Sequence, residues 1–360
     1  MSDVSLFEPD SVGDISLCNR VVMAPMTRNR ADAQGVPLPC VATYYTQRAT
    51  AGLIISEAVA VCRQGSGYSL IPGIWTDAQE AAWKKVIAAV HQAGGKFVLQ
   101  LMHTGRIAHS SLTGETPVSA SAIVPEGTVM AADFSWQPFE TPVALDEAGI
   151  GAVVEAFARA SARAIRAGAD GVEIHGANGY LPDQFLRTGS NIRSDGWGGS
   201  PAGRSRLLLE ITRAVSEAAG AARTGVRLSP WNPFNGMSDR NPGITFRDTA
   251  ERLARFRLAY LHINEAGAPN PAPGPQQLTR DMARVFGGRV LINAGYDAER
   301  ARLALEDRVA NVAGVVFGVP FIANPDLVRR LKEDIPLAAA DPATFYGGGE
   351  KGYTDYPAAP

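Results

Sequence analysis

Cysteine is scarce in this 360-residue sequence, and its three copies cannot all pair with one another. Cys18, Cys40 and Cys62 also lack the C-x-x-C spacing, so we expect free thiols and not disulfides, zinc ligands or an iron–sulfur cluster. Free thiols are typical of a reducing compartment, which indicates a cytoplasmic protein.

Long apolar runs and an excess of basic charge are also missing. The sequence contains no run of about 18 apolar residues, and its first ten residues lack the apolar stretch of a signal peptide. The 34 basic residues are balanced by 36 acidic ones, which argues against nucleic acid as a partner. No G-x-G-x-x-G motif follows a strand-like run, so a separate dinucleotide-binding domain is not expected. We therefore expect a soluble protein, monomeric or homodimeric, that acts on a small molecule and not at a membrane.

Short apolar runs that alternate with helical patterns are what the sequence does contain. Eight runs have the length and composition of buried parallel strands. Eight β–α units in one chain predict an α/β fold, a (β/α)₈ TIM barrel, with a doubly wound sheet as the alternative. No Pro-, Gly- or Ser-rich linker divides the chain, so we expect a single domain over residues 1–360. The expected strands are 20–25, 53–59, 96–102, 170–175, 225–230, 259–265, 290–295 and 314–319.

Helical patterns fill the spaces between these strands. The two longest begin at Asp77 and Asp146 and are followed by glycine, as is typical of helix ends. The weakly patterned stretch 104–143 is long enough to carry a lid or small extra elements. Aromatic residues in the tail 341–360 predict that it packs on the barrel. The expected helices are 39–51, 77–94, 146–168, 201–220, 245–257, 276–287, 297–308 and 324–333.

Polar residues gather at the carboxyl ends of the expected strands, where TIM barrels build their active sites. Gln100 can also be a satisfied buried amide, and the guanidinium of Arg227 can be paired with Glu57 or Glu173. Several such groups at one end of the barrel nevertheless favour a functional site. A metal is not expected, because His103 and His109 have no third ligand at a suitable spacing. The gathered residues are Thr27, Glu57, Ala58, Tyr68, Gln100, Met102, His103, His175, Asn178, Tyr180 and Arg227.

Two glycine-containing loops, 293–300 and 317–327, follow the last two expected strands. Gly295 and Gly318 let backbone N–H groups approach a ligand closely, although glycine is also ordinary at such turns. The loops after strands seven and eight of a TIM barrel often bind phosphate. Together with Arg227 they predict a phosphorylated cofactor with a polar ring across the barrel mouth. A nicotinamide coenzyme would have to visit the same open site.

Seven segments form a pattern that extends from about residue 6 to residue 357. They are APMTR (24–28), VLQLMHTGR (98–106), HSSL (109–112), PVSASAI (117–123), HGANGYLPDQFL (175–186), SNIRSDGWGGS (190–200) and FYGGGEKGYTDYP (345–357). The residues of these segments and the order of the segments resemble those of the old yellow enzyme family. Within that family the resemblance is greatest to bacterial ene-reductases that also reduce nitrate esters and morphinone-type enones.

The resemblance implies a TIM barrel that binds FMN non-covalently and uses NADPH or NADH as a transient hydride donor. Such enzymes reduce activated C=C bonds in enones, enals, maleimides and nitroalkenes. Hydride would pass from NAD(P)H through flavin N5 to the β-carbon, and Tyr180 would protonate the α-carbon. His175 and Asn178 would bind the substrate oxygen on which negative charge develops.

The resemblance also assigns positions around the cofactor and the substrate. Thr27 would bond flavin O4, and Pro25 and Ala58 would line the ring. Gln100 would contact the pyrimidine edge, and Arg227 would support the N1/O2 side. The remaining positions are Gly295, Gly318 and Val319 at the cofactor, and Tyr68, Met102 and Tyr346 in the substrate cavity with His175 and Asn178.

Three departures from the family pattern bear on these roles. The family usually has arginine at position 319, so Val319 predicts weaker FMN binding through backbone donors, unless another cation replaces it. Met102 stands where close relatives carry tryptophan, which predicts a different cavity shape. The segments 231–239 and 265–274 also differ, and both are expected near the substrate mouth. The candidate replacement cations are Arg280, Arg284 and Arg289.

Three alternatives remain open at the level of sequence. One is a reductase of nitrate esters or nitro compounds on the same scaffold. Another is a non-redox TIM-barrel enzyme such as an aldolase or a phosphosugar isomerase. An aldolase would need a lysine at a strand's carboxyl end, whereas Lys96 lies at the start of its strand. The last is a protein that binds flavin without turnover.

Overall fold

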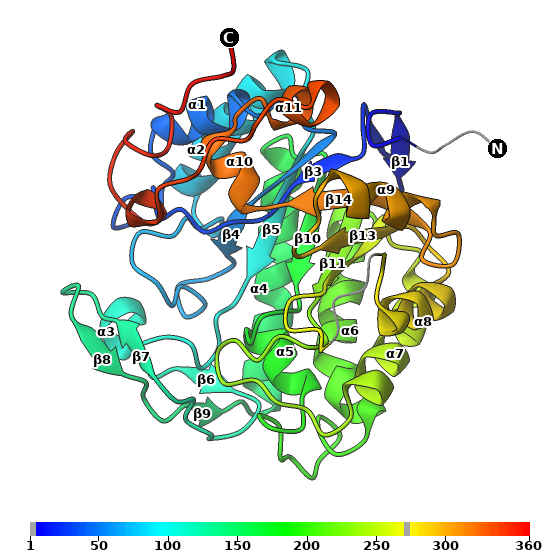
Figure 1. Cartoon of the computed structure of the whole chain (residues 1–360). Coiled ribbons are helices and arrows are strands. Elements are labelled where there is room, and N and C mark those ends of the chain that lie inside the picture. Colours follow the sequence, from blue (N-terminus) through cyan, green and yellow to red (C-terminus); the bar gives the residue numbers. More distant parts are fainter. Residues whose placement is uncertain (1–4, 270–273) are drawn as a thin grey trace.

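Eight parallel strands form a closed barrel in the computed structural model, which describes residues 5–269 and 274–360. Neighbouring strands follow one another in sequence, and β14 closes the barrel against β3 (Figure 1). This is the predicted (β/α)₈ TIM barrel, and the doubly wound alternative is wrong. The strands are β3 (Val21–Met23), β4 (Leu53–Ala60), β5 (Phe97–Met102), β10 (Gly171–His175), β11 (Thr224–Leu228), β12 (Tyr260–Asn264), β13 (Val290–Asn293) and β14 (Val312–Phe317).

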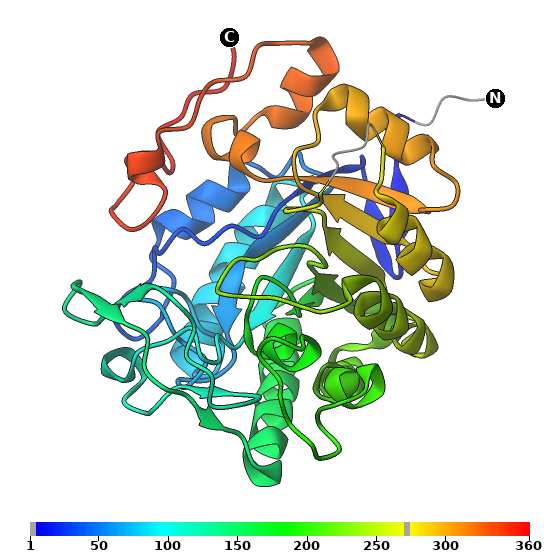
Figure 2. The same cartoon turned by 60° about the horizontal axis from the view of Figure 1, so that its bottom comes forward.

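Helices follow the strands and cover the outside of the barrel (Figure 2). Asp146 caps its helix as predicted, because its side chain accepts the N–H of Gly149. Asp77 is not a cap, since Thr76 and Gln79 form a capping box one residue earlier. The helices are α1 (Cys40–Thr46), α2 (Asp77–Gln92), α4 (Glu147–Arg166), α6 (Pro201–Ala219), α7 (Pro242–Leu253), α8 (Gln277–Phe286), α9 (Ala298–Glu306) and α11 (Leu327–Glu333), with 3₁₀ turns η1 (Ala221–Arg223), η2 (Ala254–Phe256) and η3 (Pro342–Thr344).

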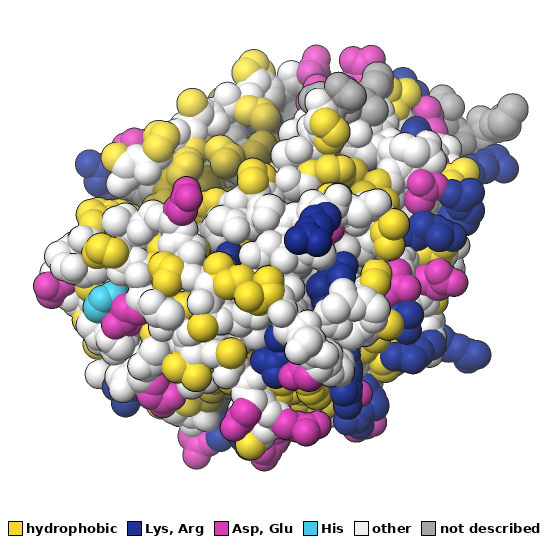
Figure 3. All heavy atoms as spheres, turned by 90° about the horizontal axis from the view of Figure 1, so that it is seen from below, with side chains coloured by type: hydrophobic (Ala, Val, Ile, Leu, Met, Phe, Trp, Pro, Cys, Tyr) yellow, Lys and Arg dark blue, Asp and Glu magenta, His cyan; other side chains and the backbone are white. Residues whose placement is uncertain are grey.

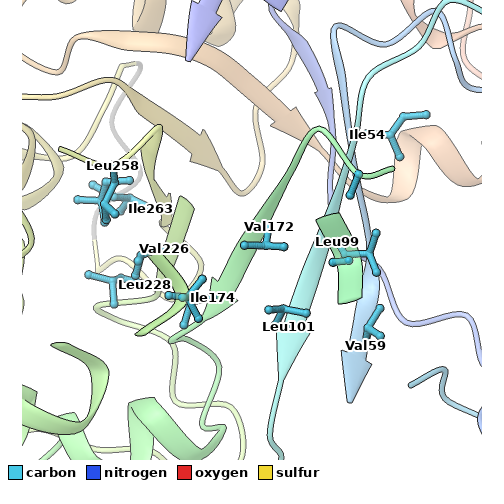
Figure 4. Close-up of a cluster of buried hydrophobic side chains, with 14 of the residues drawn as sticks. Ile54, Val59, Leu99, Leu101, Val172, Ile174, Val226, Leu228, Leu258 and Ile263 are labelled. Atoms are coloured by element: carbon cyan, nitrogen blue, oxygen red, sulfur yellow. The ribbon is translucent and has the colours of Figure 1, made fainter. Parts of the chain in front are cut away.

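On β5 and β10 the outer face is apolar, and the inner face carries polar side chains above the apolar layer to which Val98 belongs. Leu99, Leu101, Val172 and Ile174 pack in the large core that the barrel shares with its helices (Figure 4). The intervening Gln100 belongs to the opposite face of its strand, because successive side chains of a strand point to opposite sides. The sequence predicted continuously apolar strands, so this alternation is a correction.

A second apolar core fills the amino end of the barrel interior. It is closed from outside by an antiparallel hairpin of β1 (Asp10–Val12) and β2 (Ile15–Leu17). Val12, Ile15 and Leu17 of this hairpin are buried in the same cluster as Val98 and Leu291 of the barrel. The hairpin therefore plugs the end of the barrel opposite to the expected site. The cluster also contains Val22, Ala24, Leu53, Ile55, Ala259, Tyr260, Ala313 and Val316.

Short extra elements surround the carboxyl end, as the long stretch 104–143 predicted. In Figure 1 the insertion after β5 and the helix after β10 both lie below the strands. They add pairing to a loop that would otherwise be long and irregular. The elements are α3 (Ser110–Thr113), β6 (Val118–Ser119), β7 (Thr128–Met130), β8 (Trp136–Pro138), β9 (Val143–Ala144), α5 (Leu181–Leu186) and, after β14, α10 (Val319–Ala323).

The carboxyl-terminal tail packs on the barrel, as its aromatic residues predicted. The ring of Tyr353 is fully buried and stacks on Tyr44, with centroids 3.9 Å apart. The buried guanidinium of Arg28 donates to the backbone carbonyls of Phe345 and Gly352, both at 2.8 Å. Arg30 binds tail carbonyls as well. The loop after β3 therefore holds the tail against the barrel.

Figure 3 shows how charged side chains are distributed on one face of the molecule. There the Lys and Arg side chains gather toward the right of the view, and the left part carries few of them. No helix within the described residues is long and apolar enough to cross a membrane. The three cysteines are free thiols, as predicted.

Candidate active site

The loop after β3 and the end of β4 form one wall of the site. The pairing of β4 with β5 shifts register between Ile55 and Ala58, and this bulge aims the Glu57 side chain at the β3 loop. One Glu57 carboxyl oxygen accepts the backbone N–H of Arg28 at 3.1 Å and that of Asn29 at 3.3 Å. Burial raises the pKa of Glu57 to about 7, although these donors and two arginines oppose the shift. The carboxyl holds the loop that presents Pro25 and Thr27.

A layer of polar side chains crosses the barrel interior above the apolar plug. Glu173 is fully buried, and its carboxylate accepts Gln100 Nε2 at 2.7 Å and lies 2.9 Å from His262 Nδ1. Burial alone would raise the pKa of Glu173, but His262, Arg227 and Gln100 hold it below its ordinary value. Burial also lowers the pKa of His262. A neutral imidazole thus donates to an ionised carboxylate, and the negative charge of Glu173 acts on Arg227 of the neighbouring strand β11.

Arg227 lies beside this layer and is 5% exposed. Its terminal nitrogen donates to Asn293 Oδ1 at 2.9 Å, and its Nε has no hydrogen-bond partner among the described residues. The alternative explanation, an ion pair with Glu57 or Glu173, is not observed, because the ion pairs of the described residues include none to Arg227. Burial lowers the pKa of Arg227, and the negative charge of Glu173 opposes this shift without a hydrogen bond between the two side chains. The guanidinium therefore keeps donors for a ligand at the barrel mouth.

A turn at the end of β10 leads from His175 to Asn178. Its left-handed residues are Asn178 (φ 57°) and Gly179 (φ 79°). A side chain at Gly179 would collide with Asn235, whose Cβ lies 2.6 Å from the position of a Cβ there. The N–H of Asn178 donates to the Ser229 hydroxyl at 2.8 Å, which fixes the turn.

Tyr180 follows this turn and contacts two other predicted site residues. Its ring packs edge-on against His175, with centroids 4.8 Å apart, and its hydroxyl lies 3.3 Å from that of Tyr68. Burial raises the pKa of Tyr180, so the phenol keeps its proton at neutral pH. Burial and the positive charge of Arg227 lower the pKa of His175 well below its ordinary value. The site thus holds a neutral imidazole next to a protonated phenol.

Two other predicted cavity residues take different positions. Met102 is fully buried and packs with Ala58, Ile71 and Tyr180, so it supports Tyr180 from below. Tyr346, on the tail, is 70% exposed and is close enough to raise the pKa of both Tyr68 and Tyr180. The structure therefore gathers His175, Tyr180 and Tyr68, and leaves Tyr346 at the rim.

The two predicted phosphate loops lie side by side, because β13 pairs with β14. Gly295 has φ +69°, and Ala294 before it has φ +97°, a strained value for a residue with a side chain. A Cβ at Gly318 would meet only Ala24 and Met26, at 3.6 Å or more. Val319 is 54% exposed and begins α10. The loops thus offer backbone groups and open space.

The proposed replacement cations are not available to these loops. Arg280 is paired with Asp307, Arg284 with Asp281, and Arg289 with Asp10. The cation that sequence reasoning missed is Arg300, which bonds the carbonyl of Gly295 and stacks on Tyr296 at 4.6 Å. A positive charge at the edge of the loop is supplied from α9.

The segment 231–239 reaches the site, as expected of a loop at the substrate mouth. Asn232 and Asn235 both donate to Asn178, the first to its side-chain oxygen and the second to its backbone carbonyl, each at 2.9 Å. Arg106 joins this segment to the insertion by donating to the carbonyl of Gly236. The segment 265–274 contributes Glu265, which is buried, while residues 270–273 lie outside the described part of the chain.

The described residues hold no group of three or more metal-ligating side chains. His103 is fully buried, and burial lowers its pKa to about 4. His109 bonds Ser111 and caps α3 instead. The two histidines that were considered as metal ligands are thus accounted for by burial and by helix capping.

Several residues of the polar layer were missed from the sequence. Their signal was a polar residue at every second position of strands that otherwise look apolar, which is the pattern of a strand with one polar face. The strand runs 172–175 and 260–264 carry it, whereas 290–293 has a single polar residue, Asn293, at its end. The missed residues are His262, Asn264 and Asn293 on strands and Asn232 and Asn235 on a loop.

These features fit FMN. A flavin ring develops negative charge on its N1/O2 side when reduced, and the buried, unpartnered Nε of Arg227 is a donor of the kind that would stabilise such a charge. The backbone at Gly295 and Gly318 leaves room that a side chain would fill. Pro25 and Thr27 lie on the loop after β3, which is next to β14, and Ala58 lies on β4.

Comparisons with known proteins agree with the fold. Residues 5–338 match the family described as NADH:flavin oxidoreductase / NADH oxidase. A chanoclavine-I aldehyde reductase from Penicillium roqueforti is 44% identical over 98% of this chain and 95% of its own. A probable flavin mononucleotide-dependent alkene reductase from Leishmania infantum is 39% identical over 98% and 97%. A structure of morphinone reductase in complex with tetrahydroNAD superposes with a TM-score of 0.94, at 45% identity over 99% and 98% of the two chains.

Proposed function

Because the chain belongs to the NADH:flavin oxidoreductase / NADH oxidase family, we propose that the site at the barrel mouth reduces activated alkenes through the residues described above. The chain is an FMN-dependent NAD(P)H oxidoreductase that reduces activated C=C bonds, like its ene-reductase relatives. FMN, when bound, supplies the two-electron carrier between NAD(P)H and the alkene. The family decides against a non-redox barrel enzyme.

The substrate oxygen lies between His175 and Asn178 in this proposal. Both side chains donate hydrogen bonds to it, which polarises the conjugated alkene and stabilises the negative charge that develops on that oxygen. The buried, neutral His175 remains a donor across the physiological pH range. A carbonyl or a nitro group presents the required acceptor.

Tyr180 gives its phenolic proton to the α-carbon. Its pKa is raised by burial, so it is loaded with a proton before each turnover. Tyr68, 3.3 Å away, lies on the path by which that proton is replaced. The contact between the Tyr180 and His175 rings holds the donor beside the oxygen site.

The cofactor is held by Arg227 and Gln100 at the ring and by backbone groups near Gly295 and Gly318 at the phosphate. Pro25, Thr27 and Ala58 line the ring, and Val319 offers the phosphate no side-chain donor. Met102 and Tyr346 bound the substrate cavity from below and at the rim. We place the whole chain in one domain, monomeric or homodimeric, and its free thiols support a cytoplasmic location.

The observation that carries the proposal is the packing of Tyr180 against His175 at one end of a closed barrel. The test is to purify the protein with FMN and mix it with NADPH or NADH under argon. The flavin absorbance should bleach and then return on addition of an enone, a maleimide or a nitroalkene. A protein that stays yellow with both coenzymes would be a flavin binder without turnover.

A further inference from the structure

Asn178 lies at the centre of a cluster of amide side chains. Its Oδ1 accepts Nδ2 of Asn232 at 2.9 Å and Nδ2 of Asn264 at 3.1 Å. Asn264 is at the end of β12 and 5% exposed, whereas Asn232 is on the loop after β11 and half-buried. Two separate elements therefore converge on one oxygen of a predicted site residue.

The orientation of both flanking amides is fixed by the backbone. Asn232 Oδ1 accepts the N–H of Phe234, and Asn264 Oδ1 accepts the N–H of Ala266, each at 3.1 Å. A backbone N–H can only donate, so each flanking amide must turn its oxygen to that N–H and its nitrogen to Asn178. Asn178 must then turn its oxygen toward them.

We propose that Asn232 and Asn264 are positioning residues that lock the Asn178 amide with Nδ2 facing the substrate. Asn178 thereby becomes an obligatory hydrogen-bond donor, because its acceptor oxygen is already occupied twice. A free amide could rotate by 180° and present either group, so the lock removes that choice before the substrate arrives.

The lock narrows the substrate class of the proposed function, on which it rests. The site accepts an oxygen that carries lone pairs, as in a carbonyl, a nitro group or a phenolate. It disfavours a ligand whose N–H or O–H donor must face Asn178, because two donors would then meet. Asn232 belongs both to this cluster and to the loop 231–239. Substitutions in that loop should therefore alter substrate binding through the orientation of Asn178.

The test uses phenol, whose oxygen occupies the same position and whose ring stacks on oxidised flavin to give a long-wavelength absorption band. Asn232→Asp keeps the shape and the acceptor for Phe234 but offers Asn178 an oxygen, which attracts Nδ2 and turns the amide round. Asn232→Leu keeps the bulk without either group. We expect the dissociation constant of phenol to rise about 10- to 150-fold in Asn232→Asp and by less than about tenfold in Asn232→Leu.

A double-mutant cycle separates this effect from simple charge repulsion. In an Asn178→Ala background, Asn232→Asp should weaken phenol binding no more than Asn232→Leu does. A penalty of unchanged size there would overturn the lock, as would equal effects of Asp and Leu in the native background. Asn264→Asp and Asn264→Leu repeat the comparison from β12. Asn241→Asp, which alters the cap of α7, is the matched control and should leave phenol binding unchanged.

Failure of the proposed function itself would look different. In that case the unaltered holoenzyme would neither bleach with NAD(P)H nor show a phenol band. A native protein that does both, with variants that rank Leu worse than Asp, would contradict the lock alone.

Discussion

The two ends of the barrel treat charge in opposite ways. At the amino end, Asp170 is paired with His91 and Lys96 and also accepts the backbone N–H of Phe97. At the carboxyl end, Arg227 Nε and His175 Nδ1 are buried and have no partner among the described residues. The hairpin of β1 and β2 closes the first end with apolar side chains, and the second end stays polar.

This difference shows where the fold expects a ligand. A buried polar atom without a partner costs free energy, so folding alone does not favour it. At the amino end, Asp170 is satisfied from within the chain and contributes stability, while Arg20 Nε and the Tyr260 hydroxyl are buried there without a partner among the described residues. At the carboxyl end, we propose that Arg227 and His175 keep their free nitrogens for FMN and the substrate. Changes at the two ends should therefore separate into effects on binding or rate and effects on stability.

The largest expected effect removes both donors of the carboxyl end. His175→Ala combined with Asn178→Ala should weaken the binding of phenol by about 3–6 kcal/mol, because each charge-assisted hydrogen bond contributes about 1.5–3 kcal/mol. The measurement is a titration of the long-wavelength band of the oxidised enzyme. If His175 only ordered the turn, the double variant would lose stability and still bind phenol.

Replacing the proton donor should affect one half-reaction and spare the other. In Tyr180→Phe we expect alkene reduction to slow by about 10²–10⁴-fold, as is typical for loss of a general acid. Bleaching of the flavin by NAD(P)H should be unchanged, because it transfers no proton from Tyr180. Stopped-flow spectroscopy follows the two steps separately. Equal slowing of both steps would show that Tyr180 acts by shaping the site.

Glu57 should make stability depend on pH in the direction opposite to an ordinary ion pair. Its pKa is about 7 in the folded protein and 4.5 as a free side chain, so the folded chain binds more protons between these values. Stability should then fall as pH rises from about 4.5 to 7, by at most about 3 kcal/mol. Glu57→Gln should lack this fall in thermal unfolding measured from pH 5 to 8. Parallel curves for the two proteins would contradict the raised pKa.

Val319→Arg should strengthen the carboxyl end without changing its chemistry. A guanidinium at the start of α10 can bond the FMN phosphate, which should tighten FMN binding by about 1.5–3 kcal/mol. Turnover at saturating FMN should change little, because the phosphate is remote from the reacting atoms. Recovery of flavin fluorescence on dissociation gives the constant. An unaltered constant would indicate that Arg300 already supplies the charge at Gly295.

The smallest expected effect belongs to the amino end. Asp170→Asn should lower the free energy of unfolding by about 1–2 kcal/mol at pH 7 and leave phenol binding and turnover unchanged. Burial would raise the pKa of Asp170, but Phe97, His91 and Lys96 lower it. Its contribution is therefore present above the ordinary pKa and is lost as pH falls below it. If Asp170→Asn lost activity without losing stability, the amino end would contribute to catalysis, and the proposed division of roles between the two ends would be wrong.

The order of the β–α units was predictable because each strand carries an apolar run and each helix its own boundary signals. The hairpin of β1 and β2 that closes the amino end was not predicted, because each of its strands has only three residues. The polar layer of the interior was harder to foresee, since single residues such as His262 and Asn293 break runs that are otherwise apolar. Only the closure of the eight strands into a barrel shows that these side chains belong to the same polar layer of the interior.

The candidate site was predictable where residues are close in sequence and not where they meet through folding. His175 and Tyr180 lie within six positions, so their contact could be predicted from the sequence. The contact of Asn178 with Asn232 spans 54 positions and depends on a loop whose path no local pattern fixes. The strands β6 to β9 were missed because two or three residues are too few to show a period.

The hydrogen bonds between the β3 loop and the carboxyl-terminal tail have a consequence for the biosynthesis of the protein. The guanidinium of Arg28 bonds the carbonyl of Phe345, 317 positions later, and β3 pairs with β14. The ribosome therefore makes the β3 loop, one wall of the proposed flavin pocket, at the start of synthesis. The elements that contact this loop and β3, the tail and β14, are made only near the end. Capture of FMN must wait until translation is almost finished, so a truncated product carries no complete pocket and stays colourless.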